Sequence, residues 1–252
     1  MTRKAGEGST GGRESLLPRL DARLGESGLI LRGGFVPDMG EHLLAGATGK
    51  PARTLLLIGN AGSAIWPHFR RWLSRQPAGL EHPLDRWTRA IVEPVAAEFG
   101  ARAVFPFDRP WPPFQQWAMR AEGLRPSPLG ILMHPEFGLW HAYRAALLFE
   151  TEIPIQAPRK SIHACDDCIE NPCLSACPVD AFSASGFAAD ACRGYLATVI
   201  SSSIDSTVKP NRERLPDCMG DGCAARNACP VGTDFRYRPE QMRFHMRAFA
   251  KG

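Results

Sequence analysis

Apolar residues recur at two periods along residues 15–160, and these periods predict a mixture of helices and strands. Helical spacing occurs in residues 16–24, 65–73 and 84–99, and we expect the last helix to bend at Pro94. Short apolar runs predict strands in RTLLLIG, ARAVFPF, GILMH and LWHAYRAALLFE, although the last run is also compatible with a helix. Because helices and strands do not alternate with βαβ spacing, a layered α+β body is favoured over a doubly wound parallel sheet.

A change of composition marks the domain organisation. The Pro-punctuated stretch Ile153–Lys160 is followed by a region that holds every cysteine of the chain. We therefore predict a disordered leader over residues 1–14, a body over 15–160, a small cysteine-rich domain over 161–235 and a basic tail over 236–252.

Composition narrows the class of protein. The chain has 252 residues, of which 44% are hydrophobic and 22% charged, as in ordinary globular proteins. No apolar run approaches the ~18 residues of a membrane span, and the polar start lacks the apolar core of a signal peptide. The sequence thus predicts a cytoplasmic protein without membrane contact, in which the eight cysteines bind metal rather than form disulfides.

Charge is unevenly distributed along the chain. The stretch Cys165–Cys229 carries five Lys and Arg against nine Asp and Glu, a balance of −4, whereas Phe235–Gly252 has a balance of +4. The basic tail is suited to docking a redox partner or an anionic ligand. A solvent-facing helix with cations toward its C-terminal end explains it equally simply, and we favour that interpretation.

The cysteines follow the pattern C-x2-C-x4-C-x3-C-P, then an isolated cysteine, then C-x4-C-x5-C-P. Bacterial two-cluster ferredoxins use C-x2-C-x2-C-x3-C-P twice, and each cysteine before proline binds the other cluster. Carried onto this chain, that pattern implies two 4Fe–4S clusters. The first would be bound by Cys165, Cys168, Cys173 and Cys229, and the second by Cys177, Cys192, Cys218 and Cys223.

Both loops depart from the compact ferredoxin pattern. The first has two extra residues before Cys173, and a long excursion separates Cys192 from Cys218. Two zinc sites with four cysteines each would also use eight thiolates. We favour iron–sulfur clusters because two Cys-Pro endings are not typical of zinc ribbons.

Two stretches before the cysteines resemble the CblC (MMACHC) cobalamin-processing family. One is SPLGILMHPEFGLWHAYRAALLFETEIPIQAPRK (127–160), with its HPxFGxW motif; the other is RTLLLIGNAGSAIWPHFRRWL followed by HPLDRWTRAIV. The cysteine region is similar to epoxyqueuosine reductase, which has a C-x-x-Y-L element like that at Cys192–Leu196.

The resemblance implies a flavin-reductase-like (nitroreductase-related) fold with a base-off cobalamin beside two clusters. It makes His134, Phe137, Gly138 and Trp140 candidate cofactor-binding residues. A strand-end histidine and a core tryptophan are the ordinary alternatives for the first and last of these. Epoxyqueuosine reductases continue into a helical-repeat domain that holds tRNA. This chain stops 23 residues after Cys229, so nucleic acid is not an expected partner.

These features predict an iron–sulfur reductase that carries electrons from an external reductase, ferredoxin or flavodoxin through two clusters to a corrinoid. Carboxylates inside the first ligand loop, such as Asp166, and beside the second, such as Asp217, favour low cluster potentials. Trp111, Phe114 and Trp117 offer part of an aromatic wall for a flat cofactor. FMN in place of cobalamin, and a non-catalytic ferredoxin-type carrier, remain alternatives. No catalytic residue is assigned.

Overall fold

A computed structural model describes residues 16–38, 41, 44–158, 163–183, 186–204 and 216–251; the predicted leader at 1–14 lies outside them. The chain divides into two compact units. Unit 1 comprises residues up to Gly59, His68–Trp117 and Tyr143–Ala157, and unit 2 comprises Asn60–Pro67, Ala118–Ala142 and residues from Pro158 onward. Residues 118–142 therefore group with the cysteine-rich region by contacts, and the boundary at residue 160 stays a prediction.

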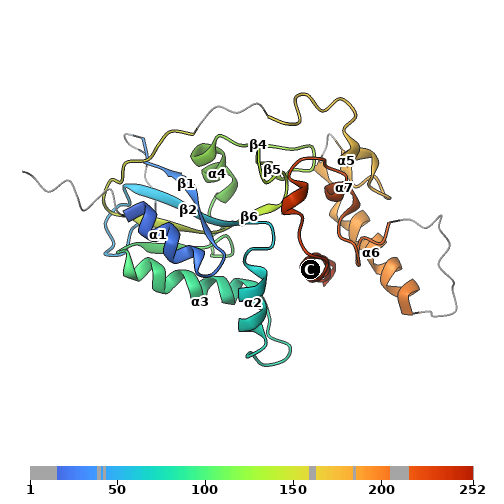
Figure 1. Ribbon diagram of the computed structural model, residues 1–252, viewed down its shortest axis with the longest axis horizontal. Helices are drawn as coiled ribbons and strands as arrows, with labels where there is room; N and C mark the ends of the chain where they lie inside the picture. Colours follow the sequence, from blue (N-terminus) through green and yellow to red (C-terminus); the bar gives the residue numbers. More distant parts are fainter. Residues whose placement is uncertain are drawn as a thin grey trace, which may run out of the picture. The chain divides into compact units, whose positions relative to one another are not determined.

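A four-stranded sheet forms the centre of unit 1. Its strands are ordered β1 (Ile30–Phe35), β2 (Thr54–Ala61), β6 (His141–Phe149) and β3 (Arg102–Val104), and the β1–β2 and β3–β6 pairs are antiparallel (Figure 1). Every residue from Thr54 to Asn60 is buried, which explains the uninterrupted apolar run in the sequence. The predicted strand at residues 139–150 is confirmed as a strand.

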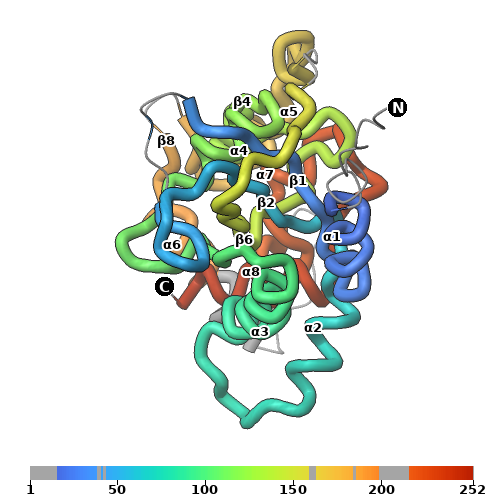
Figure 2. Tube along the Cα trace, turned by 90° about the vertical axis from the view of Figure 1, so that its left-hand side faces the viewer, coloured from blue at the N-terminus to red at the C-terminus, as the bar shows by residue number. Residues whose placement is uncertain are grey.

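Two helices of unit 1 contact each other and the edges of this sheet. Helix α1 (Leu16–Gly25) contacts β1, and α3 (Pro83–Glu98), which contains Pro94, contacts β3. Their apolar faces are buried, as helical spacing predicts. Helix α2 (Trp66–Leu73) follows β2, and the turn between α2 and α3 extends away from the sheet (Figure 2). Helix α4 (Phe114–Glu122) begins in unit 1 and ends in unit 2.

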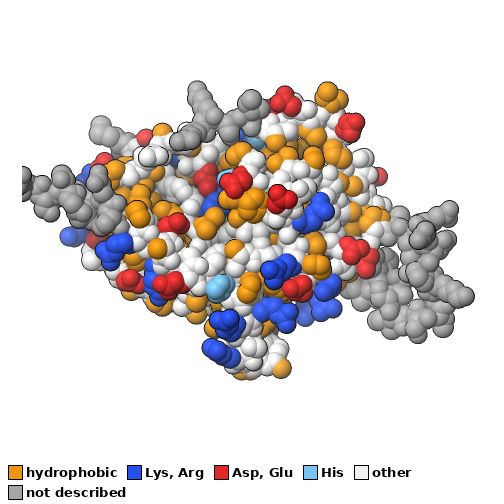
Figure 3. Space-filling view, in the orientation of Figure 1, with side chains coloured by type: hydrophobic (Ala, Val, Ile, Leu, Met, Phe, Trp, Pro, Cys, Tyr) orange, Lys and Arg blue, Asp and Glu red, His pale blue; other side chains and the backbone are white. Residues whose placement is uncertain are grey.

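Unit 2 is built from short elements. Two hairpins pair β4 (Arg125–Pro126) with β5 (Leu132–Met133) and β7 (Phe182–Ser183) with β8 (Gly186–Phe187). The helices of this unit are α5 (Pro172–Ser175), α6 (Ala189–Ile204), α7 (Ala224–Asn227) and α8 (Pro239–Lys251), with a 3-10 turn at Thr233–Phe235. Helix α5 contacts α7, and α6 contacts α8. The basic tail is thus mostly helical, and Figure 3 shows Lys and Arg side chains gathered over α8.

Two strands are shorter than the apolar pattern predicts. The run ARAVFPF is extended only over Arg102–Val104, because the Asp108 carboxylate accepts the Phe105 amide proton and closes a turn. The run GILMH is extended only over Leu132–Met133, because His134 and Gly138 exchange backbone hydrogen bonds around a tight loop.

The predicted mixture of helices and strands is confirmed, and the structure adds the antiparallel β1–β2 and β3–β6 pairs, whereas the ferredoxin-like nature of the cysteine-rich region stays a prediction. In the described part of the chain, no helix combines the length and the apolar character needed to cross a membrane.

Candidate functional site

Four cysteines from two distant segments meet at one small cavity in unit 2. The cavity has a volume of about 50 Å³, and its wall includes Cys165, Cys168, Cys173 and Cys229. Apolar side chains such as Met133 and Leu139 complete the wall, and both belong to a buried cluster with Cys173 and Cys229. The structure therefore brings together the four thiols that the ferredoxin pattern assigned to the first cluster. Their role as ligands stays a proposal.

A second thiol group gathers around α6 and α7. The pKa of the Cys192 thiol is raised to about 11, first by burial and then by repulsion from the Cys223, Cys177 and Cys218 thiolates. A hydrogen bond bridges the long excursion between Cys192 and Cys218: the Tyr195 hydroxyl donates to the Pro216 carbonyl at 2.6 Å. Tyr195 belongs to the C-x-x-Y element, so this bond fixes α6 next to the Cys218 loop.

Burial and mutual repulsion oppose ionisation in the first group as well. Burial raises the pKa of the Cys165 thiol, and the Cys229, Cys173 and Cys168 thiolates add to that shift. The pKa of Cys173 is raised for the same reasons. Grouped thiolates of this kind are stabilised by a cationic metal centre, which binds as their protons leave.

Backbone amides already point at several of these sulfurs. The Ala181 amide donates to Cys177 Sγ at 3.3 Å. Amides of Ala225 and Arg226, at the start of α7, donate to Cys223 and lower its pKa against the larger effect of burial. Such N–H···S bonds favour the thiolate and are one of the levers by which proteins set iron–sulfur potentials.

The donor set suits an iron–sulfur cubane. Each of the two groups brings together four soft thiols, the number that a 4Fe–4S cluster requires. Among the described residues, no three His, Cys, Asp or Glu side chains are arranged around a single metal ion. In a cubane each cysteine binds its own iron, so the four sulfurs need not converge on one point.

The negative charge of Asp166, which the sequence predicts to lower a cluster potential, is partly neutralised in the structure. Asp166, in the first ligand loop, forms an ion pair with Arg125 of β4. His163 lies beside the same carboxylate, with its Nδ1 3.8 Å from Asp166 Oδ1, and its Nε2 is 3.0 Å from the Arg125 carbonyl oxygen. These contacts fasten the first loop to β4. They also reduce the share of Asp166 in any lowering of the first cluster's potential.

The HPEFGLW motif packs directly against the chain that follows Cys229. Gly138 has φ +56°, and a Cβ atom there would overlap the Val231 carbonyl. A Cβ atom on Gly232 would likewise overlap the Phe137 backbone. The two glycines therefore permit a backbone-to-backbone approach between the motif and the Cys229 loop.

Aromatic contacts extend this packing. The His134 and Phe137 rings stack at 4.0 Å, and His134 Nδ1 accepts the Phe137 amide proton at 3.0 Å. Trp140 is buried and meets Tyr237 edge to face at 5.4 Å. The Arg226 guanidinium lies 4.4 Å from the Trp140 ring centroid and donates to the Leu139 carbonyl. All four candidate cofactor residues thus lie in unit 2. Phe137, Gly138 and Trp140 contact the chain that follows the last cysteine, and the binding of a cofactor by the four residues stays a prediction.

Unit 1 contains two adjoining hollows, most of whose lining residues form no recognisable pattern in the sequence. One measures about 410 Å³ and the other about 290 Å³, and both are lined by Asp85, Phe107 and Trp111. Other lining residues include Arg86, Arg89, Arg109, Tyr143 and Arg144. Trp111 is 69% exposed, and the Arg109 guanidinium lies 3.3 Å from its ring centroid. Only Trp111 was anticipated as part of a cofactor wall.

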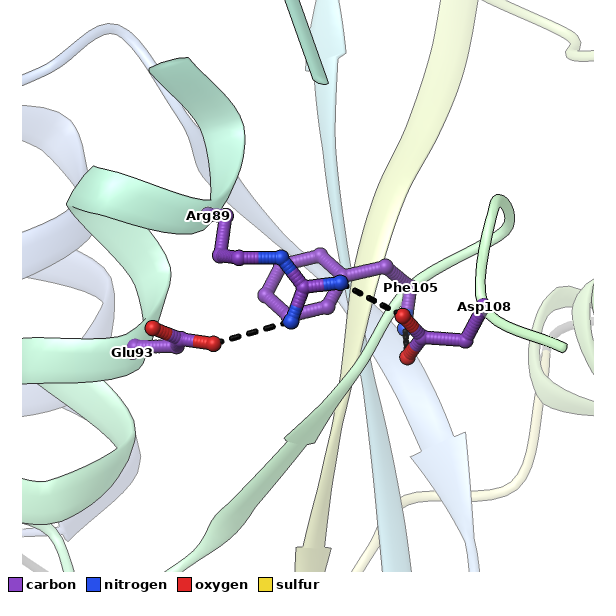
Figure 4. Close-up of polar contacts among 4 residues, drawn as sticks. All are labelled: Arg89, Glu93, Phe105 and Asp108. Carbon is purple, nitrogen blue, oxygen red and sulfur yellow. Dashed lines mark hydrogen bonds and ion pairs between the residues drawn. The ribbon is translucent and has the colours of Figure 1, made fainter. Parts of the chain in front are cut away.

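The wall of the larger hollow is held by the ion pairs shown in Figure 4. Arg89 donates to Glu93 at 2.9 Å and to Asp108 at 2.6 Å, and its guanidinium lies 4.4 Å from the Phe105 ring centroid. Asp108 also accepts the Phe105 amide proton at 2.9 Å. These bonds fix the start of the loop that presents Arg109 and Trp111. The arginines that line this hollow come from different elements and have no fixed separation along the chain, so their grouping could not be predicted from the sequence.

Comparisons with known proteins show which solved structures share this fold. No protein-family model and no curated protein matches the chain. Among solved structures, the C. elegans B12-trafficking protein CblC, a human MMACHC homologue, is 13% identical with a TM-score of 0.54; the match covers 95% of this chain and 94% of that one. This chain therefore has the fold of the CblC protein, as the sequence resemblance implied.

Epoxyqueuosine reductases are also among the similar structures. One, solved with an epoxyqueuosine-modified tRNA-Tyr stem loop, is 15% identical with a TM-score of 0.49, and the match covers 92% of this chain and 69% of that chain. The enzyme from Bacillus subtilis is 14% identical with a TM-score of 0.48 and the same coverage. Both kinds of protein that the sequence suggested are thus found. The expectation that nucleic acid is not a partner gains no support.

Proposed function

We propose that this protein is an iron–sulfur reductase that passes electrons through two 4Fe–4S clusters to a base-off cobalamin. The observation that supports this proposal most directly is the grouping of the eight cysteines into two sets of four, each drawn from separate segments of unit 2. The clusters supply one-electron transfer when bound, and the corrinoid supplies the cobalt that accepts the electrons.

The residues around the thiols serve to hold and shield the clusters. Apolar side chains exclude water from the first group, and amides at the start of α7 donate to a sulfur of the second. The HPEFGLW motif holds the Cys229 loop through the glycine contacts and the Arg226–Trp140 stack. On this proposal, residues recognised from the cobalamin family also act as structural support for a cluster ligand.

The hollows of unit 1 are the proposed corrinoid site. Their volumes, about 410 and 290 Å³, fall within or near the ~300–1,000 Å³ typical of small-molecule pockets. Trp111 and Tyr143 offer aromatic surface for the macrocycle, and arginines such as Arg109 suit the phosphate of the displaced nucleotide tail. The same features suit FMN, with its flat ring and phosphate, so FMN is the second candidate.

The first test is anaerobic reconstitution with iron and sulfide, followed by analysis of metal and acid-labile sulfide. We expect iron and sulfide sufficient for two clusters per chain, with broad visible absorption that bleaches on reduction. Replacing Cys165 by Ala should remove one cluster, and replacing Cys223 by Ala should remove the other. Ser175→Ala, an exposed position on α5, is the control and should retain both. Stoichiometric zinc without sulfide would refute the iron–sulfur proposal.

The second test separates cobalamin from FMN. Titration of the reconstituted protein with each cofactor should give saturable binding of cobalamin, with a base-off spectrum, and no saturable binding of FMN. Trp111→Ala should weaken cobalamin binding and leave the iron content unchanged, since Trp111 lies in unit 1 and the thiols lie in unit 2. Tight binding of FMN alone would favour the second candidate.

A further inference from the structure

The outward face of α8 carries a row of cations. Arg243, Arg247 and Lys251 recur every four residues and are exposed. Arg236 and Arg238, just before the helix, are also exposed. We call these five residues the basic stripe. Glu240 is the single acidic residue of the helix. Within the described part of the chain, no carboxylate forms an ion pair with the stripe.

The opposite face of α8 covers the second thiol group. Gln241 is only 1% exposed, and a Cβ atom on Gly222 would lie 2.7 Å from Met242 Sδ. Phe249 receives the Arg193 guanidinium 5.2 Å from its ring centroid. Gly222 and Arg193 are the chain neighbours of Cys223 and Cys192. The inner face of the helix therefore touches residues adjacent to two of the proposed ligands.

This packing sets the distance from the stripe to the thiol group. An α-helix with its side chains is about 10–12 Å across. A protein docked on the stripe would thus be separated from the neighbours of Cys192 and Cys223 by about one helix diameter. That makes the outward face of α8 a short route to the second cluster from the protein surface.

The distribution of charge selects the kind of partner. The stripe is basic, whereas the stretch Cys165–Cys229 has a balance of −4 and its carboxylates Asp167, Glu170 and Asp221 are exposed. An acidic protein is attracted by the stripe and repelled by the ligand loops, so its approach is oriented toward α8. A localised cationic row beside an anionic region fits a small acidic partner.

We infer that a small acidic electron-carrier protein, of the flavodoxin or ferredoxin kind, docks on the basic stripe and reduces the cluster of the second thiol group. The inference rests on the proposed function and adds the partner and its point of entry. In each encounter one electron leaves the carrier and one 4Fe–4S cluster passes from the 2+ to the 1+ state. No bond forms or breaks, and no proton is required.

Nucleic acid is the other polyanion that a basic stripe attracts. Single-stranded nucleic acid is bound by combining such cations with exposed aromatic rings on which bases stack. The aromatic rings of α8 point inward: Phe244 meets Trp66 at 5.5 Å, and Phe249 meets Phe187 at 5.9 Å. The stripe itself therefore offers cations without a stacking platform, which favours the protein partner.

The test compares the triple variant R243E/R247E/K251E with the matched control R70E/R71E/R75E. The control reverses three exposed arginines of unit 1 and changes the net charge by the same amount. Reduced flavodoxin is mixed anaerobically with each reconstituted protein, and cluster bleaching is followed by stopped flow. At low salt the triple variant should be reduced at least about 10-fold more slowly than wild type, and the control less than twofold.

Two controls and a binding measurement separate an effect on docking from an effect on the clusters. The difference should disappear at about 1 M salt, where screening acts within about 3 Å, and reduction by dithionite should be equal in all three proteins. Binding of oxidised flavodoxin, measured by calorimetry, tests docking independently of the clusters. If no cluster assembles in any of the proteins but the triple variant alone loses flavodoxin binding, the proposed function is refuted and the docking surface stands. Intact clusters with equal flavodoxin rates in both variants would overturn the docking inference. Unchanged flavodoxin rates with lost binding of an RNA stem loop would also overturn it and assign the stripe to nucleic acid.

Discussion

Replacing Gly138 by Ala is the sharpest test of how the HPEFGLW motif is used. The residue has φ +56°, and an added Cβ atom would overlap the Val231 backbone just beyond Cys229. A non-glycine residue in the left-handed region costs about 1–2 kcal/mol. Overpacking against backbone adds about 1–3 kcal/mol. We therefore expect the variant to lose about 2–5 kcal/mol of stability and to release the first cluster preferentially.

Gly130 provides the matched control for that variant. It also has a positive φ, of +75°, but an added Cβ atom would meet nothing within 4 Å. Gly130→Ala should therefore incur only the backbone cost, about 1–2 kcal/mol, and retain iron for both clusters. The assay is urea unfolding of the reconstituted proteins with iron analysis after gel filtration. Equal stability and equal iron content in the two variants would refute the close packing of the motif against the Cys229 loop.

Three further predictions concern single contacts. Tyr195→Phe removes the hydrogen bond to the Pro216 carbonyl, so we expect a loss of about 0.5–1.5 kcal/mol in urea unfolding and faster loss of the second cluster to a chelator; equal chelation rates would contradict this. Arg226→Lys keeps the charge but not the planar stack on Trp140 and Tyr237, and it should destabilise the protein about as much as Arg226→Met; full recovery by lysine would show that charge alone matters. Asp108→Asn weakens the pair with Arg89 and should reduce cobalamin affinity without changing iron content, as measured by spectral titration; unchanged affinity would place the corrinoid outside these hollows.

Periodicity predicted the regular elements of unit 1 well. The leucines of α1 are apolar on the one face that is buried. The continuous apolar run of β2 corresponds to a strand that is buried on both faces. The strands at residues 101–107 and 130–134 were predicted too long. There, a side-chain carboxylate and a tight loop around Pro135 end the strand, and hydrophobicity alone contains no signal for either.

The thiol grouping could be predicted because the cysteine spacing follows the ferredoxin pattern, in which the cysteine before proline pairs with a distant loop. The surroundings of the thiols could not. The ion pair between Arg125 and Asp166 and the bond from Tyr195 to Pro216 join residues far apart in sequence. The arginine-lined hollows were missed for the same reason: Arg109 and Arg144 come from different elements and have no fixed spacing.

The most direct test of the central claim is an anaerobic titration of the reconstituted protein with hydroxocobalamin, followed by reduction with a protein electron carrier. We predict a saturable shift to the base-off spectrum, then cobalt(I) absorption that appears as the reduced clusters are reoxidised. The Cys223→Ala variant should bind the corrinoid but form cobalt(I) slowly. Intact, reducible clusters with no change in the cobalamin spectrum would contradict the account.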